Sequence, residues 1–184
     1  MSAPEIETAR LRLRQFREDD LDAFADIYSD PDVVKYLGTG LPALKEETAQ
    51  HLSNLITNHW EQKRHGRWAV IDKADGRLIG LCGLRLLEGA PELVYLMSKP
   101  YWGRGLAPEA ARACLRYAFE ELQLERVVAI TRPENAASRR VLDKLGLQYE
   151  RDARFYDIDC VLYAITRDEY KPDDAPYLLK NSDG

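Results

Sequence analysis

The chain has 184 residues, of which 45% are hydrophobic and 31% are charged, and this is enough for one well-buried domain of an ordinary soluble kind. Its formal net charge of −5 argues against a nucleic-acid-binding protein, because nonspecific binding to nucleic acid needs a basic surface. No apolar run approaches the ~20 residues that span a bilayer, and the N-terminus lacks the apolar core of a signal peptide. We therefore expect a cytoplasmic protein without a membrane partner.

The cysteines and histidines give no sign of a metal site. The cysteines are odd in number, widely separated and embedded in apolar patterns, so we expect buried free thiols: Cys82, Cys114 and Cys160. The histidines fall in one helical region with poor spacing for a metal, so we expect exposed helix positions: His51, His59 and His65.

The first third of the chain is predicted to contain one strand and two helices. Leucine alternates with arginine over residues 10–16, which indicates a strand. Apolar residues at helical spacing predict a helix over 18–29 that ends before Pro31. Residues 30–44 are expected to form a loop with a short turn of helix at Val33 and Val34 as an alternative, and a second helix is expected over 45–63.

The central third is predicted to form three strands and a helix. Strands over 67–72 and 77–87 are joined at Asp75 and Gly76, a common hairpin turn pair. A strand over 92–98 then leads into a glycine-rich turn, and a strongly amphipathic helix follows that turn.

The last third alternates again between strand and helix. A strand over 126–131 precedes a helix over 136–145, and a hairpin over 148–166 closes the fold. Because strands joined by a helix lie parallel and strands joined by a turn lie antiparallel, we expect a mixed α/β sheet. A single domain is expected over 1–170, with a loosely held or disordered tail over 171–184.

The segment 102–110, with the sequence WGRGLAPEA, predicts a phosphate-binding turn. Gly103 and Gly105 tolerate positive φ angles and lack the Cβ atoms that would obstruct a ligand. The following helix adds unpaired N–H groups and the positive end of its dipole. Such a turn can bind a phosphate or pyrophosphate, whereas a plain tight turn is the alternative.

Three further segments extend the pattern: PENAASRRVLDKLGL over 133–147, TARLRLR over 8–14 and VLYAITRDEY over 161–170. Together with the glycine turn they resemble the GNAT superfamily of acyl-CoA-dependent N-acyltransferases. They look most like the branch that contains the ribosomal-protein alanine N-acetyltransferases. The resemblance covers residues 6–170.

The resemblance implies a mixed, mostly antiparallel sheet flanked by helices, with a central parallel pair of strands that splay apart. These are the strands at 92–98 and 126–131, and the pantetheine arm of acetyl-CoA enters between them. The helices at 18–29 and 45–63 would overhang the acceptor site. The implied activity is direct transfer of an acetyl group from acetyl-CoA to a primary amine in a ternary complex.

Two groups of residues would hold the co-substrate acetyl-CoA, and no metal is implied. Backbone N–H groups of the turn would bind the pyrophosphate: Gly103, Arg104, Gly105, Leu106 and Ala107. Backbone groups of the strand end would pair with the pantetheine and polarise the thioester carbonyl: Leu96, Met97 and Ser98. Trp102 stands where the family usually has Gln or Arg, so binding would depend more on the backbone. Arg104 would bring a positive charge near the phosphates or lie in solvent.

Glu92 is the candidate catalytic base. Strand alternation places Glu92, Val94 and Leu96 on one face, and apolar surroundings would raise the pKa of the carboxylate toward a useful range. The alternative is an exposed glutamate at a strand edge after Pro91. An acceptor amine with a pKa near 8 is about a tenth neutral at pH 7 and needs little help from a base.

Asn135 and Ser138 lie three residues apart at the start of a helix, so both can point into the same gap. By resemblance, Asn135 binds the pantetheine, and Ser138 is near the sulfur, where it could protonate the leaving thiolate. The alternatives are helix capping by Asn135 and a hydrogen bond from Ser138 to the backbone. Tyr95 and Tyr149 are the other candidate acids. Two arginines of this helix would either contact the 3′-phosphate of acetyl-CoA or lie on a solvated helix face: Arg139 and Arg140.

Other functions remain open. A non-catalytic acyl-CoA-binding regulatory module would keep the same pocket without turnover. A Rossmann or P-loop nucleotide site is disfavoured because the turn follows four strands and no Lys-Ser/Thr pair follows it. Peptide N-termini, polyamines, amino acids and aminoglycosides all remain candidate acceptors, and the chain could be a monomer or a homodimer.

Overall fold

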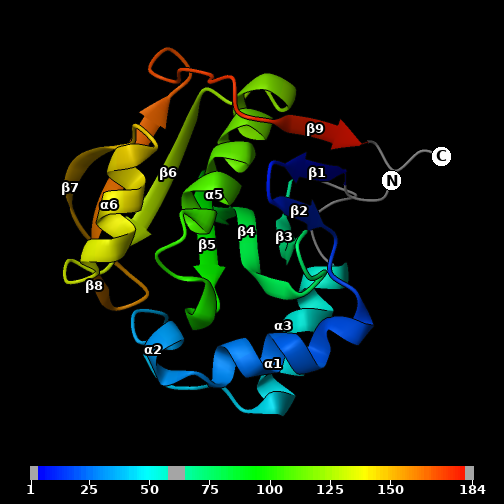
Figure 1. Ribbon diagram of the computed structural model, residues 1–184. Helices are drawn as coiled ribbons and strands as arrows, with labels where there is room; N and C mark the ends of the chain where they lie inside the picture. The colour runs from blue at the N-terminus through cyan, green and yellow to red at the C-terminus, as the bar shows by residue number, and fades with distance from the viewer. Residues whose placement is uncertain (1–3, 58–64, 181–184) are drawn as a thin grey trace.

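The computed structural model describes residues 4–57 and 65–180, and these form one twisted sheet with helices on both faces (Figure 1). The strand order is β7-β8-β6-β5-β4-β3-β2-β1-β9. The strands have these bounds: β1 Glu5–Thr8, β2 Leu11–Arg14, β3 Arg67–Asp72, β4 Leu78–Leu87, β5 Ala90–Met97, β6 Arg126–Thr131, β7 Gln148–Phe155, β8 Ile158–Thr166 and β9 Tyr177–Lys180.

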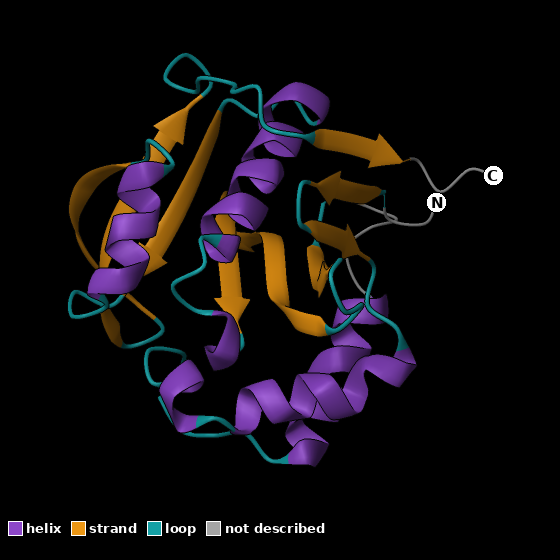
Figure 2. Cartoon of the chain, viewed as in Figure 1, coloured by secondary structure: helices purple, strands orange, loops and turns teal. Residues whose placement is uncertain are grey.

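Among the described residues, helices lie in the connections from β2 to β3, from β5 to β6 and from β6 to β7, whereas turns and loops join the other strands (Figure 2). Their bounds are η1 Glu18–Asp20, α1 Leu21–Ser29, α2 Pro31–Val34, α3 Lys45–Thr57, η2 Lys99–Tyr101, α5 Leu106–Arg116, η3 Tyr117–Glu121 and α6 Ala136–Lys144. Here η1 and η2 are 3-10 helices, whereas η3 continues α5 as a π-helical turn. In the described part of the chain, no helix is both long and apolar enough to cross a membrane.

The two faces of the sheet are buried by different helices, as strand alternation requires. On β3, Trp68 is fully buried and its ring lies 5.2 Å from that of Tyr117, at the end of α5. The next residue, Ala69, packs instead with Phe24 of α1 and Leu55 of α3. The sheet therefore separates an α5 side from an α1/α3 side, and a strand residue's position determines which side it faces.

The sheet opens between β5 and β6. These two strands are parallel and share one register pair, Glu92 with Val128, whereas β5 pairs with β4 from Ala90 to Met97. The antiparallel pairs on either side of this opening are complete, so the fold class expected from the sequence is confirmed. The opening leaves the β6-facing edge of β5 beyond Glu92 without a strand partner.

Most predicted elements are confirmed, including the strand over 126–131 and the helix that ends before Pro31. The predicted helix over 45–63 is described as far as Thr57, and its last residues lie outside the described part of the chain. The sequence pattern missed β1 and the π-helical turn. The cysteines are buried and free, as expected: Cys82, Cys114 and Cys160.

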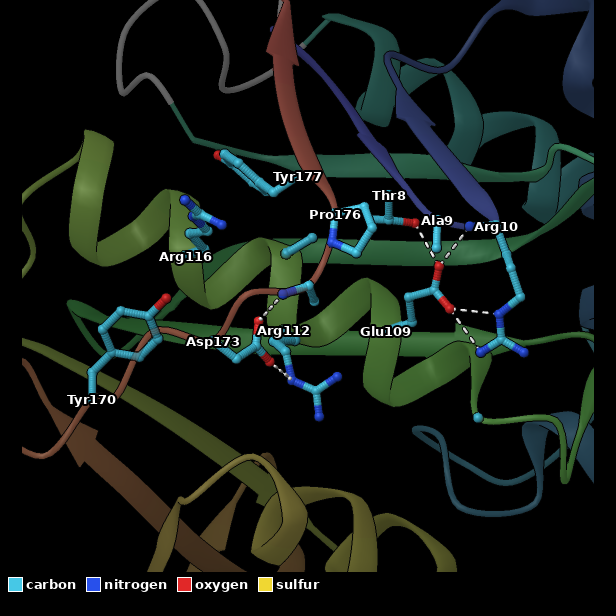
Figure 3. Close-up of a pocket in the computed structure, with 13 residues that line it drawn as sticks. Thr8, Ala9, Arg10, Glu109, Arg112, Arg116, Tyr170, Asp173, Pro176 and Tyr177 are labelled. Atoms are coloured by element: carbon cyan, nitrogen blue, oxygen red, sulfur yellow. Dashed lines mark hydrogen bonds and ion pairs between the residues drawn. The ribbon is translucent and has the colours of Figure 1, made fainter.

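The expectation of a loosely held tail is wrong for its last described residues. β9 pairs antiparallel with β1, from Glu5 with Lys180 to Thr8 with Tyr177. The tail is also held against α5, where Arg112 forms an ion pair with Asp173 at 2.8 Å (Figure 3). Four residues are too few for strand alternation to be recognised, and their partner strand lies at the other end of the chain.

Charged groups stabilise this corner of the fold. Glu109 of α5 accepts hydrogen bonds from the Thr8 hydroxyl at 2.7 Å and from the Arg10 backbone and side chain at 2.8 and 2.7 Å (Figure 3). The guanidinium of Arg116 lies 4.5 Å above the ring of Tyr177. The β1–β2 turn, α5 and β9 are therefore joined, and the small cavity between them, about 160 Å³, has its main charges already paired.

Candidate active site

The glycine turn adopts the conformation for which its glycines were predicted. Gly103 and Gly105 have φ angles of 72° and 73°, and Gly105 is the N-cap residue of α5 without a side-chain cap. A Cβ at Gly103 would have no described atom within 4 Å, so the backbone is openly accessible there. The first N–H groups of α5, from Leu106 and Ala107, precede the helical hydrogen bonds. The turn therefore presents a set of backbone donors to one site.

A groove of about 710 Å³ runs from this turn along β5 to α6. It is lined by all of the predicted co-substrate residues except Ser98 and Arg104: Leu96, Met97, Trp102, Gly103, Gly105, Leu106, Ala107, Asn135 and Ser138. Basic side chains from α6 and the segment after α2 also line it: Lys35, Arg140 and Lys144. Of these, the sequence interpretation had singled out Arg140 and missed both lysines.

The end of β5 presents its backbone differently from the prediction. The N–H of Ser98 donates to the carbonyl of Ile79 at 2.7 Å, so Ser98 faces the β4 side and its amide is occupied. Backbone direction alternates along a strand, so Met97 and Tyr95 face the open side. The indole N–H of Trp102 donates to the Met97 carbonyl at 2.8 Å. The Ser98 backbone is therefore not free to pair with a ligand as predicted, because its carbonyl also accepts from the Tyr101 N–H at 3.0 Å.

Arg104 points away from the groove. Its guanidinium lies 3.9 Å from a carboxylate oxygen of Asp72 and 5.3 Å from the ring centre of Tyr101. Its backbone carbonyl accepts a hydrogen bond from Arg10 at 2.8 Å. The positive charge of Arg104 is thus directed to the other side of the turn, and the basic side chains that line the groove come from α6 and the segment after α2.

A second cavity of about 410 Å³ lies on the α1/α3 side of the sheet. Its lining includes aromatic, charged and thiol side chains from nine segments of the chain: Tyr28, Tyr36, His51, Arg67, Arg85, Glu92, Arg132, Tyr156 and Cys160. Six residues line both the cavity and the groove: Tyr36, Leu37, Tyr95, Leu96, Asn135 and Ser138. The two hollows therefore meet between β5, the first turn of α6 and the segment after α2.

Glu92 lies in this second cavity and is 1% exposed. The predicted face is confirmed, because Val94 and Leu96 pack against the cluster on the α1/α3 side, whereas Leu93 and Met97 belong to the cluster on the α5 side. The alternative of an exposed strand edge is wrong. The predicted apolar surroundings are incomplete, however. Arg85 on β4 donates to both carboxylate oxygens, at 2.5 and 3.1 Å. Glu92 is therefore a buried carboxyl group that is paired with a guanidinium group.

At the start of α6, two hydroxyl groups lie close together. The side-chain oxygen of Asn135 accepts from the Ser138 N–H at 3.1 Å, so the helix-capping role of Asn135 is confirmed. The Ser138 hydroxyl lies 2.9 Å from the hydroxyl of Tyr95. Burial raises the pKa of Tyr95 to about 12, with the Ser138 hydrogen bond acting in the opposite direction. Tyr95 is therefore a protonated phenol at neutral pH.

Two of the other predicted candidates lie elsewhere. Tyr149 is 51% exposed, lines neither hollow, and donates to Asp152 at 3.0 Å, so it is not placed to act as the acid. Arg139 donates to the Tyr163 hydroxyl at 3.2 Å and to the Pro133 carbonyl at 3.3 Å. Its side chain is held against β8 rather than along the groove.

His51 lines the second cavity, so its predicted exposure on α3 is wrong. Its ring lies 5.5 Å from that of Phe24 and 5.3 Å from that of Tyr28. Burial, together with the smaller effect of the Arg67 and Arg85 guanidinium groups, lowers the pKa of His51 to about 4. The spacing of four residues to the buried Leu55 was the signal that could have identified this face.

The other histidines follow no common pattern. His65 is buried rather than exposed, and His59 lies outside the described residues. Within 4–57 and 65–180, no group of three or more histidine, cysteine, aspartate or glutamate side chains is arranged to hold a metal ion.

The fold, the glycine turn and the groove agree with a family match. Residues 10–148 match the family described as "Acetyltransferase (GNAT) domain". The chain belongs to the GNAT family. It is an acetyl-CoA-dependent N-acetyltransferase, as the resemblance implied. Its co-substrate is acetyl-CoA, and the open glycine turn fits the phosphates of that molecule.

Relatives cover nearly the whole of this GNAT chain. The uncharacterized N-acetyltransferase p20 of Bacillus licheniformis is 30% identical, over 89% of this chain and 96% of its own length. The FsC-acetyl coenzyme A-N(2)-transacetylase of Aspergillus fumigatus is 29% identical, over 97% of this chain and 83% of its own length.

Solved structures agree with the fold. A GNAT-family acetyltransferase from Bacillus anthracis superimposes with a TM-score of 0.79 at 29% identity, over 90% of this chain and 99% of that one. A ribosomal-protein-S5-alanine acetyltransferase from Vibrio fischeri gives a TM-score of 0.71 at 22% identity, over 91% of this chain and 99% of that one. At that identity the likeness concerns the fold alone, so it does not identify the acceptor.

Proposed function

We propose that this acetyltransferase transfers the acetyl group directly from acetyl-CoA to the primary amine of an acceptor in a ternary complex. The carrying observation is that the groove on the glycine-turn side and the cavity on the α1/α3 side meet at Tyr95, Leu96, Asn135 and Ser138. Two substrates that enter from opposite sides can touch there, and holding both at one point removes much of the entropic barrier to their reaction.

Acetyl-CoA would occupy the groove. Its pyrophosphate would accept hydrogen bonds from backbone N–H groups between Gly103 and Ala107, at the positive end of α5. Arg140 and Lys144 line the same groove and would add charge beside the phosphates. The pantetheine would lie along the open edge of β5, where Met97 and Tyr95 present backbone groups.

The acetyl carbonyl would lie where the groove meets the cavity. A backbone N–H of β5 at that place would stabilise the oxyanion that forms when the amine attacks. Removal of one such donor has cost other enzymes about 3 kcal/mol of transition-state stabilisation. Tyr95 lines both hollows and its backbone faces the open side, whereas Leu96, two residues from Ser98, directs its N–H toward β4.

Proton transfer would use the groups at that junction. The amine nitrogen forms a bond to the carbonyl carbon, the carbon–sulfur bond breaks, and the thiolate leaves with the electron pair. Glu92 would accept the amine proton, directly or through water. Ser138 would donate its hydroxyl proton to the thiolate and recover one from Tyr95, whose hydroxyl is 2.9 Å away. The phenol would regain its proton from solvent.

Release of free thiol from acetyl-CoA, measured with a panel of amines, tests this function. Amine-dependent thiol release together with an acetylated product supports it. A protein that binds acetyl-CoA but releases no thiol with any amine would instead be an acyl-CoA-binding regulatory module. Thiol release that requires no amine would indicate hydrolysis and contradict transfer.

A further inference from the structure

The cavity on the α1/α3 side carries an excess of positive charge. Of the described residues that line it, Arg67, Arg85 and Arg132 are cationic, and Glu92 is the acidic one. Glu92 is already paired with Arg85 through two hydrogen bonds. His51 adds no charge at neutral pH, because burial lowers its pKa to about 4. Two guanidinium groups thus face the cavity without a compensating carboxylate from its described lining.

Arg67 is the first of the two cations without a carboxylate partner in the cavity. The folded chain removes water from its guanidinium group, and this burial lowers the pKa of the group. Among the described residues its recorded side-chain hydrogen-bond contact is with His51 Nε2, at 3.5 Å from Nη1, a long distance for a hydrogen bond. A desolvated cation is costly unless an anion or several acceptors compensate it.

Arg132 is the second such group. Its Nη2 donates to the Gly38 carbonyl at 2.7 Å, whereas its buried Nε has no hydrogen-bond partner among the described residues. Arg132 follows β6, whereas Arg67 begins β3, so the two cations reach the cavity from different segments. A positive potential is therefore built into the walls of the cavity and does not depend on one side chain.

From these contacts we infer that the acceptor amine carries its own carboxylate, as a small amino acid does, and that Arg67 binds that carboxylate. The inference rests on the proposed function, because it concerns the acceptor of that reaction. A guanidinium fork matches a carboxylate with two parallel hydrogen bonds. A polyamine would place further positive charge against Arg67 and Arg132, and this repulsion disfavours it. A cavity of about 410 Å³ also suits a small acceptor.

Matched acceptors test the inference directly. We would measure kcat/KM with acetyl-CoA and the twenty L-amino acids. The best amino acid is then compared with its own amide, with the amine formed by its decarboxylation, and with spermidine. We expect the free amino acid to exceed each of these at least about tenfold, as expected for a hydrogen-bonded charge pair. Dipeptides that begin with Asp or Glu distinguish a side-chain carboxylate from an α-carboxylate.

Variants then assign the effect to Arg67. Arg67→Gln should lower kcat/KM about ten- to one-hundredfold for the amino acid and little for its amide, with an unchanged acetyl-CoA dissociation constant. Arg67→Lys should recover part of the loss, because it keeps the charge but not the fork. Arg151→Gln, at an exposed position of β7 outside the cavity, is the control and should match the wild type.

Two results would overturn the inference while the acetyltransferase function stands. One is an amide, a decarboxylated amine or spermidine that is acetylated as efficiently as the amino acid. The other is an Arg67→Gln variant, folded and able to bind acetyl-CoA, that loses activity equally with all acceptors. If acetyl-CoA binds but no amine of the panel is acetylated, the proposed function fails and the inference fails with it.

Discussion

Arg85 on β4 and Glu92 on β5 are direct cross-strand partners, and both carboxylate oxygens of Glu92 accept hydrogen bonds from the Arg85 guanidinium. The Glu92 side chain is 2% exposed and that of Arg85 is 39% exposed, so the pair spans the wall of the cavity from interior to opening. Residues directly opposite in an antiparallel pair lie on the same face, which is why the two side chains meet.

Glu92→Gln is expected to lower turnover and to weaken its rise with pH, while acetyl-CoA affinity stays nearly unchanged. Glutamine keeps the shape of the side chain but cannot take the amine proton. Unfolding free energy should fall by about 1–3 kcal/mol, less than for a fully buried pair because Arg85 is 39% exposed. Steady-state rates against pH and thermal unfolding measure both effects.

Arg85→Gln is the matched control for that experiment, because it breaks the same ion pair and keeps the carboxylate. A base role predicts that only Glu92→Gln flattens the pH profile. Equal loss of turnover in both variants, with the wild-type pH profile, would show that Glu92 acts only by holding Arg85.

Gly105→Val is expected to raise the acetyl-CoA dissociation constant severalfold or more. A Cβ at Gly105 would meet the Arg10 side chain only at 3.6 Å, so the effect comes from the positive φ of 73° and from the loss of open backbone. Gly76→Val is the control, with a φ of 72° in the β3–β4 turn and open space around its Cβ. Both variants should lose about 1–2 kcal/mol of stability.

Titration calorimetry with acetyl-CoA separates the two glycine variants. Only the Gly105 variant should bind more weakly, since Gly76 does not line the groove. Wild-type affinity in a folded Gly105→Val protein would move the pyrophosphate site away from the turn.

Ser138→Ala is expected to reduce kcat with little change in the acceptor KM. The loss should stay below about a hundredfold, because a thiolate whose pKa is about 8.5 already leaves readily. Stability should change little, since the helix cap is the Asn135 side chain and its hydrogen bond goes to the Ser138 backbone. Asn135→Ala, by contrast, should lose about 1 kcal/mol.

Tyr95→Phe tests whether the second hydroxyl supports the first. If Tyr95 returns the proton to Ser138, Tyr95→Phe should lower kcat. The double variant Tyr95→Phe/Ser138→Ala should then be no slower than Ser138→Ala alone. Full turnover in Ser138→Ala would exclude the Ser138 hydroxyl as the acid and leave Tyr95 or water as the proton donor.

Protonation of His51 should destabilise the fold in mild acid. Its pKa is lowered to about 4 by burial and by Arg67 and Arg85, from about 6.5 in the unfolded chain. The folded state therefore binds fewer protons, so this contribution is fully present above pH 6.5 and is lost as pH falls toward 4. We expect a loss of about 1–2 kcal/mol after allowance for partial exposure.

His51→Gln isolates that contribution, because glutamine does not titrate. Urea unfolding from pH 7 to pH 4 should show a shallower decline in the variant than in the wild type. Parallel curves for the two proteins would mean that His51 is protonated equally in both states.

A chain that ends at Tyr170 tests the role of the C-terminal strand. It removes β9 and uncovers β1, together with the surface against which Tyr177 and Leu179 are half-buried. Stability should fall by about 1–3 kcal/mol, whereas acetyl-CoA affinity should persist because the groove contains no residue after Lys144. Unchanged thermal unfolding would show that β9 adds nothing to the sheet.

Local patterns were sufficient where the physical cause is local. The positive φ angles of Gly103 and Gly105 follow from a turn that only glycine adopts easily, and the strand over 126–131 is confirmed at both ends. Alternation also placed Glu92 on the same face as Val94 and Leu96, which pack on the α1/α3 side, because the side-chain period of a strand does not depend on its neighbours. The mixed sheet and the groove beside the glycine turn could be predicted on this basis.

Tertiary structure decided which charges meet. Arg85 reaches Glu92 because a hairpin register places them opposite each other, and β9 finds β1 across almost the whole chain. The sequence predicts His51 as an exposed helix residue and Arg67 as the first residue of a strand, whereas in the structure both line the cavity. The spacing of apolar residues shows which side chains share a face of one helix or strand. Burial and pairing depend on which other element covers each face, and that is determined only when distant segments pack together.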